Sequence, residues 1–395
     1  MKKGFYYLLL GISFSLTRCA PDYFDKIEYL EYSIVKQDVV DYAHLDKLNP
    51  ILGDFKDFLL FLDKKLIFRV AALSYPTVDP NGKEVIASGL VFHPVSKKSK
   101  GVIDFMPTAH MDSEGGGTDE LYAVEGILIL MGYTVIIPDL LGSGISKDMP
   151  IPFLFAENTG RVAYDMRRAA AQYLWDEFRY QIPSQTIIMG YSLGGSAALA
   201  AQKYYETRHS NRVKVKEVYA SSGAYDLEIA FKVFAKTGFS DYPSIPNIIL
   251  GFKHYYFDER GQTLDLSQIF TGELLANYAN WFGGTYTSPE IMEMLGSNLH
   301  AYLHEDFFKP YEQQNPAFQS LYPYLKENTL IEGWSPKAPI TMTHATVDSY
   351  VPTACADAAV KNFRRAGTNI SYITYPGNHL TTGYLWFIRS IFHFL

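Results

Sequence analysis

Short apolar runs alternate with longer segments of helical spacing over much of this chain. Apolar, β-branched runs predict strands, and apolar residues three and four apart predict helices. The predicted strands are 66–75, 85–93, 101–106, 134–140, 186–190, 213–220, 339–344 and 370–375. The predicted helices are 121–131, 161–180, 196–205, 355–366 and 385–394. Several strand runs, such as 135–137 and 187–189, are apolar without alternation, which is typical of parallel strands buried on both faces. The pattern predicts an α/β fold: a mostly parallel central sheet flanked by helices.

The alternation stops between residues 226 and 335, where β-branched runs are few and aromatic residues are many. Helices are expected there at 227–236, 274–282 and 289–295. We therefore predict a large, mainly helical cap, residues 226–335, inserted after the sixth strand. Residues 66–225 and 336–395 then form the α/β core. Residues 19–65 are expected to form a leader that packs on this core, with a helix near 42–48.

The first 18 residues have the pattern of an export signal. Lys2 and Lys3 precede a largely apolar, uncharged run over residues 4–16, which is too short to span a membrane. The Leu-Thr-Arg-Cys stretch that ends at Cys19 resembles a bacterial lipoprotein signal, although Arg18 stands where a small residue is usual. We predict that residues 1–18 are a signal peptide and that Cys19 is lipidated. The protein would then be exported and held at a membrane of a bacterial cell envelope; without the lipid it would be secreted or periplasmic.

Composition and charge exclude several classes of protein. Hydrophobic residues make up 48% and charged residues 19%, so the chain is not intrinsically disordered. With 35 Lys and Arg against 42 Asp and Glu, the net charge is −7. Removal of residues 1–18 takes away Lys2, Lys3 and Arg18 and gives −10 (−7 − 3). Nucleic acid is therefore not expected as a partner, because phosphate binding needs a basic face.

One motif carries a specific chemistry. The strand at 186–190 and the helix at 196–205 are joined by the Gly-x-Ser-x-Gly sequence Gly190, Tyr191, Ser192, Leu193 and Gly194. This strand-turn-helix context is that of a nucleophile elbow, in which the serine stands at the tip of a sharp turn. Ser192 is the predicted nucleophile, and the backbone N–H of Leu193 is a predicted oxyanion donor.

A serine nucleophile needs a histidine base and an acid that orients it, and in this context the chain order is Ser, acid, His. Asp348 follows the strand at 339–344, and His379 follows the next strand at 370–375. We predict that Ser192, Asp348 and His379 form a catalytic triad. Asp139, after an earlier strand, is the weaker candidate for the acid, and His344 is interpreted as structural because it ends a strand.

The elbow, the Asp348–Pro352 loop and the Gly377-Asn378-His379 turn resemble those of the α/β-hydrolase superfamily over roughly residues 66–395. Within it the chain is most similar to the secretory lipases and related bacterial esterases. One departure concerns the loop at 105–112, where many members have His-Gly but no glycine follows His110. The second oxyanion donor is then the backbone N–H of Thr108, Ala109 or Met111, and we favour the Thr108–Ala109 stretch.

The resemblance implies an exported serine hydrolase that cleaves carboxylic esters, with lipid or small acyl esters as substrates, through an acyl-enzyme intermediate. A serine peptidase of the prolyl-oligopeptidase or aminopeptidase kind is the main alternative, since such enzymes share the triad. An acyltransferase and a catalytically silent binding protein are further alternatives. No cofactor is expected, because the glycines at 142–144 are not followed by the Lys-Ser/Thr of a phosphate loop. No metal is expected, because His300 and His304 lack the intervening Glu of a zinc motif.

Overall fold

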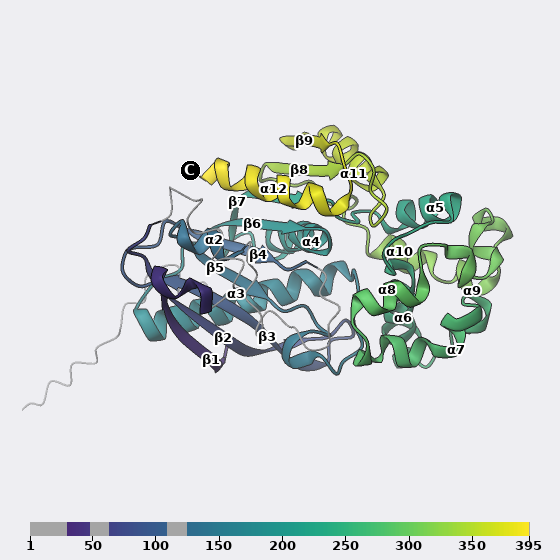
Figure 1. The fold of residues 1–395 in the computed structure, drawn as a ribbon, viewed down its shortest axis with the longest axis horizontal. Helices are drawn as coiled ribbons and strands as arrows, with labels where there is room; N and C mark the ends of the chain where they lie inside the picture. Colours follow the sequence, from purple (N-terminus) through teal and green to yellow (C-terminus); the bar gives the residue numbers. More distant parts are fainter. Residues whose placement is uncertain (1–29, 48–62, 109–124, 395) are drawn as a thin grey trace, which may run out of the picture.

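The computed structural model describes residues 30–47, 63–108 and 125–394. Within them the strands form one sheet of nine strands in the order β1-β2-β3-β5-β4-β6-β7-β8-β9 (Figure 1). The strands are β1 (Ser33–Asp41), β2 (Ile67–Val78), β3 (Glu84–Pro94), β4 (Val102–Met106), β5 (Thr134–Pro138), β6 (Gln185–Tyr191), β7 (Lys214–Ser221), β8 (Ile340–Ala345) and β9 (Ile370–Tyr375). The pairings from β1 through β3 to β5 are antiparallel, and those from β5 through β4 to β9 are parallel.

Helices cover both faces of the sheet. They are α2 (Glu125–Leu130), α3 (Ala156–Phe178), α4 (Leu193–Arg208), α11 (Thr353–Arg365) and α12 (His379–Phe394). Apolar side chains of α2 and α12 share one buried cluster with the strands, and those of α3, α4 and α11 pack on the other face. Strands β4 and β5 are buried at every position, as expected for parallel strands between two helical layers. The predicted α/β fold, with a mostly parallel sheet flanked by helices, is confirmed.

The sequence analysis did not predict the first strand. Within residues 19–65, where a leader was expected, β1 pairs antiparallel with β2 along the edge of the sheet. Most of its side chains are exposed, so the apolar periodicity that marks a half-buried strand is missing. The expected helix at 42–48 is a 3₁₀-helix, Tyr42–Lys47. Because β1 adds a strand, the helical segment follows the seventh strand, β7, and not the sixth as predicted.

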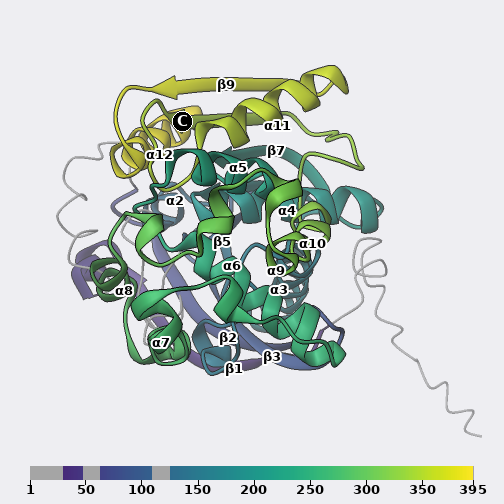
Figure 2. The same cartoon turned by 90° about the vertical axis from the view of Figure 1, so that its right-hand side faces the viewer.

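Residues 226–335 connect β7 to β8, and we call them the helical insertion. Its α-helices are α5 (Leu227–Thr237), α6 (Ser244–Phe252), α7 (Gly272–Asn280), α8 (Ser288–Leu295), α9 (Pro316–Gln319) and α10 (Tyr322–Glu327). These helices gather at one end of the sheet, and Figure 2 shows them in front of the strands when that end faces the viewer. The insertion has its own core, in which Phe252, Phe270 and Phe307 are fully buried.

A buried ion pair joins α3 to the centre of the sheet. The guanidinium of Arg167 lies 2.9 and 3.1 Å from the two carboxylate oxygens of Asp104 in β4, and it also donates to the Pro183 carbonyl. Both side chains are almost completely buried. Such a pair fixes how the helix lies on the strand, because either charge without the other would be costly in this environment.

Candidate active site

Ser192 occupies the single position between β6 and α4. Its backbone has φ 60° and ψ −122°, a conformation that residues other than glycine rarely adopt. The Ser192 N–H donates to the Ser221 carbonyl at the end of β7, over 2.9 Å, which secures the turn to the neighbouring strand. Strain of this kind persists only where the surrounding structure imposes it, and it occurs most often at functional sites.

Two glycines allow this turn to be so sharp. A Cβ atom at Gly190 would lie 1.9 Å from the Gly194 carbonyl oxygen, so strand and helix approach too closely for any side chain. A Cβ atom at Gly194 would lie 2.4 Å from the Met106 carbonyl oxygen and 2.8 Å from that of Pro107. The elbow therefore packs directly against the loop that follows β4. The expected strand-turn-helix context of Gly190, Tyr191 and Gly194 is present.

The three side chains expected to form a triad lie within hydrogen-bond distance of one another. His379, the first residue of α12, has its Nε2 atom 2.8 Å from Ser192 Oγ and its Nδ1 atom 2.7 Å from Asp348 Oδ2. Asp348 stands in the loop between β8 and α11. The carboxyl ends of β6, β8 and β9 thus bring together residues that are 187 and 31 positions apart.

The Asp348 carboxylate is buried and has partners on both oxygens. Oδ1 accepts the backbone N–H groups of Tyr350 and Val351 at 3.0 and 2.9 Å. Oδ2 faces Nδ1 of His379 and, at 3.2 Å, Nε2 of His344. Burial acts to raise the pKa of Asp348, but hydrogen bonds from His344 and His379 outweigh it, and this pKa lies well below its ordinary value. The group is an anion held in one orientation.

Two tyrosines fix the His379 ring and backbone. The Tyr350 ring stacks on the imidazole, with centroids 5.0 Å apart and an interplanar angle of 17°. The Tyr191 hydroxyl donates to the His379 carbonyl, and its own ring is buried beneath the site. Both tyrosines stand inside motifs that the sequence marked, but nothing in the sequence indicates which way their rings point.

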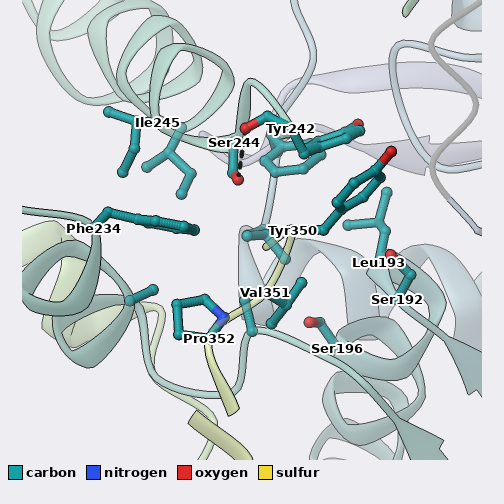
Figure 3. A pocket seen from close by; sticks show the side chains of 15 residues that line it. Ser192, Leu193, Ser196, Phe234, Tyr242, Ser244, Ile245, Tyr350, Val351 and Pro352 are labelled. Carbon is teal, nitrogen blue, oxygen red and sulfur yellow. Dashed lines mark hydrogen bonds between the residues drawn. The ribbon is translucent and has the colours of Figure 1, made fainter. Parts of the chain in front are cut away.

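A narrow pocket begins at Ser192 and extends beneath the helical insertion (Figure 3). It has a volume of about 30 Å³. Its wall is mostly apolar and includes Phe153, Phe234, Ile245, Ile248, Val351 and Pro352. In Figure 3, Phe234 and Ser192 lie on opposite sides of the pocket. Because α5 and α6 supply much of this wall, the insertion covers one side of Ser192.

Two of the expected oxyanion donors, Leu193 and Thr108, lie at or next to the elbow. Leu193 is the first residue of α4, and N–H groups in the first turn of a helix have no partner inside the helix. Thr108 follows the Met106–Pro107 segment that packs against Gly194, so it lies on the loop next to the elbow. Ala109, His110 and Met111 lie outside the described residues, as do residues 1–18 and Cys19.

Other sequence candidates have different surroundings. Asp139, the weaker candidate for the acid, accepts a hydrogen bond from the Ser88 hydroxyl in β3. His300 stacks on Phe308, and His304 Nδ1 accepts the Asp306 N–H. In the part of the chain that the structure describes, no group of His, Cys, Asp or Glu residues is arranged to hold a metal ion.

His344, interpreted from the sequence as structural, contacts the carboxylate of Asp348, the expected acid. The only hint in the sequence was its position, four residues before Asp348.

Among the described segments, no helix is both long enough and apolar enough to cross a bilayer.

Comparisons with known proteins agree with this geometry at the level of the fold. No family model matches the chain, and no curated protein matches it either. A solved structure from Legionella pneumophila, described as that of a hydrolase, has a TM-score of 0.75 and 19% identity over 93% of this chain and 97% of that one. The esterase LipA from Xanthomonas oryzae, described as degrading the rice cell wall, has a TM-score of 0.71 and 19% identity over 88% and 91%. Lipase A from Candida antarctica has a TM-score of 0.59 and 16% identity, covering 88% of this chain and 77% of the lipase.

Taken with the strand order and the elbow, these similarities define the class: the chain has the α/β-hydrolase fold. The superfamily resemblance seen in the sequence motifs is confirmed as a likeness of fold. At these low identities the similarity extends no further than the fold.

Proposed function

We propose that the protein is an exported serine hydrolase that cleaves carboxylic esters, with Ser192 as nucleophile, His379 as general base and Asp348 as the orienting acid. The observation that carries the proposal is the hydrogen-bonded chain from Ser192 through His379 to Asp348 at the mouth of an apolar pocket. A hydroxyl is a weak nucleophile at neutral pH, and this arrangement is the one that activates it.

In the proposed reaction, Ser192 Oγ attacks the ester carbonyl while His379 Nε2 takes the hydroxyl proton. The oxyanion accepts hydrogen bonds from the Leu193 N–H and from a second donor in the Thr108–Ala109 loop. The imidazolium, stabilised by Asp348, gives its proton to the departing alcohol and leaves an acyl-enzyme. Water, activated by His379, then attacks the acyl carbonyl and releases the acid and free Ser192.

The pocket favours a short acyl group. Its volume of about 30 Å³ is small beside the roughly 300–1,000 Å³ of pockets that hold drug-sized ligands. Its apolar wall suits hydrocarbon and offers no cation for a charged chain end among the residues that line it. We therefore expect esters from acetyl to butyryl to be hydrolysed faster than long-chain esters.

The peptidase alternative would need an anchor for a substrate amine. The carboxylates of the insertion that could serve are Asp226, Glu228, Asp241, Asp258 and Glu259. Asp226 accepts the Ile229 N–H at the start of α5, and Asp258 pairs with Lys253. In the described part of the chain, none of the five lines the pocket at Ser192. This distribution of charge favours an ester over a peptide substrate.

The test is hydrolysis of p-nitrophenyl esters from acetyl to palmitoyl by the wild type and by Ser192→Ala, with labelling by a fluorophosphonate probe in parallel. Turnover and labelling that both require Ser192 support the proposal. Labelling without ester turnover would point to the peptidase or acyltransferase alternatives, to be separated with peptide amides and alcohol acceptors. No labelling of folded protein would refute the serine mechanism and favour the silent binding protein.

Export and lipidation rest on the sequence of residues 1–19. The proposed anchor at Cys19 is tested by expression in a bacterium with labelled palmitate, comparing the wild type with Cys19→Ser. Label that depends on Cys19, together with recovery in the membrane fraction, supports the anchor. Unlabelled protein in the medium or periplasm would contradict it.

A further inference from the structure

His344 is a fully buried histidine at the end of β8, and the proposed reaction does not use it. Its Nε2 atom lies 3.0 Å from the Val351 carbonyl oxygen and 3.2 Å from Asp348 Oδ2. Both neighbours are acceptors only, so Nε2 must carry the proton. That single N–H serves the acid and the loop that follows it. The other ring nitrogen, Nδ1, has no hydrogen-bond partner among the described residues.

As a consequence, both oxygens of the Asp348 carboxylate face hydrogen-bond donors. The backbone of Val351 makes two hydrogen bonds: its N–H donates to Asp348 Oδ1, and its carbonyl accepts from His344. Oδ2 lies between Nε2 of His344 and Nδ1 of His379. Rotation of the carboxylate about its Cβ–Cγ bond would break contacts with both histidines at once. The hydrogen bond from His344 also contributes to the low pKa of Asp348.

We infer that His344 is a positioning residue: through its Nε2–H it holds Asp348 in the orientation that keeps His379 ready to accept the Ser192 proton. The inference rests on the proposed function, because it assigns a role within the same triad. His344 touches neither Ser192 nor a substrate. Its effect on the rate is therefore expected to pass through Asp348, either directly or by way of the Val351 backbone that also holds this carboxylate.

A core histidine that merely fills space would behave differently. Loss of such a residue lowers stability and disturbs the site whether or not Asp348 is present. A positioning residue has no effect once its target is gone, so the two roles separate in a double-mutant cycle. The chain offers a matched control in His93, a buried histidine of β3 that bonds to Thr134 and packs between Phe178 and Tyr180.

The experiment measures kcat and KM on p-nitrophenyl butyrate for the wild type, His344→Leu, His344→Gln and His93→Leu. It then repeats His344→Leu in an Asp348→Ala background. Denaturant unfolding of each variant shows that the protein is folded under assay conditions. Should His344→Leu not fold, His344→Phe replaces it, since Phe keeps a ring of similar size without a donor.

We expect His344→Leu to lower kcat about 10- to 100-fold, as the loss of a hydrogen bond to a charged group predicts. KM should change by less than about threefold, because no substrate contact is lost. His344→Gln, whose amide can donate from nearly the same place, should recover most of the rate, and His93→Leu should leave kcat unchanged. In the Asp348→Ala background, His344→Leu should cost less than about twofold.

An equal loss with and without Asp348, or a Gln variant as impaired as the Leu variant, would overturn the inference and return His344 to a structural role. Wild-type turnover that does not depend on Ser192 would refute the proposed function as well. Turnover that depends on Ser192 together with an additive cycle would refute this inference alone.

Discussion

Asp348→Asn is the substitution whose outcome the structure constrains most tightly. The backbone N–H groups of Tyr350 and Val351 both donate to Oδ1, so the asparagine carbonyl oxygen must occupy that place. The amide NH₂ then takes the position of Oδ2, facing His379 Nδ1 and His344 Nε2. An NH₂ group can only donate, and His379 must respond by placing its proton on Nε2.

In that tautomer Nε2 of His379 cannot accept the Ser192 proton, although every atom remains close to its original position. The two hydrogen bonds that the carboxylate accepted, at 2.7 and 3.2 Å, are both lost: His379 Nδ1 now accepts from the amide, and His344 Nε2 faces a second donor. Each hydrogen bond to a charged group contributes about 1.5–3 kcal/mol, so the two together amount to about 3–6 kcal/mol. At about 1.4 kcal/mol per factor of ten, kcat should fall about 10²- to 10⁴-fold.

The assay is p-nitrophenyl butyrate hydrolysis at neutral pH, with Asp357→Asn as the matched control. Asp357 is an exposed aspartate on α11, and its conversion should leave kcat within about twofold of the wild type. KM of Asp348→Asn should stay close to the wild-type value, because the pocket is untouched. A loss of less than about tenfold in folded Asp348→Asn would refute the reasoning and reopen the choice of acid.

Three further predictions concern the pocket and the stability of the fold. Phe234→Ala removes the ring across the pocket from Ser192, so the ratio of kcat/KM for octanoyl over butyryl esters should rise about tenfold; an unchanged ratio in an ester series would show that the acyl chain lies elsewhere. Burial lowers the pKa of His93 to about 4, so the unfolded chain binds the proton first and stability should be lost as the pH falls from about 6.5 to 4. His93→Leu should flatten this dependence by up to about 1.4 kcal/mol per pH unit. Urea unfolding of the wild type and His93→Leu at pH 7, 6 and 5 checks this; an equal change of unfolding free energy with pH in both proteins would contradict it. Arg167→Met leaves the Asp104 carboxyl buried without its cation and should cost about 3–5 kcal/mol of unfolding free energy in urea, whereas a cost below about 1 kcal/mol would mean that the pair is not structural.

The sequence predicted the parallel half of the sheet because each of its strands carries a local signal. Strands such as β5 and β6 are short apolar runs bounded by turn residues, and every expected strand from residue 66 onward is present. Strand β1 was not predicted, because an exposed edge strand needs no apolar face and is held mainly by backbone pairing with β2. Backbone hydrogen bonds to a neighbouring strand leave no hydropathy pattern, so the sequence pattern did not reveal β1.

Some features of the candidate site could likewise be predicted from the sequence, and others could not. Chain order and strand-end loops were enough to select Ser192, Asp348 and His379, since the carboxyl ends of parallel strands meet at one edge of a sheet. The contact of His344 with the acid was not predictable. It depends on the direction of one buried side chain and on the path of the loop from Asp348 to Val351.

The sequence by itself therefore determined the α/β layering, the strained elbow at Ser192 and the order of the proposed triad residues, because these follow from local periodicity, from glycines where backbones must pass closely, and from connectivity. The tertiary structure alone decided what surrounds them: the His344 N–H on Asp348, the tyrosine stacked on His379, and the pocket walled on one side by α5 and α6. The first depends on the path of the loop between His344 and Asp348, and the second on the packing of that loop against the start of α12. The pocket depends on how the insertion packs against the sheet, and no local pattern specifies any of these arrangements.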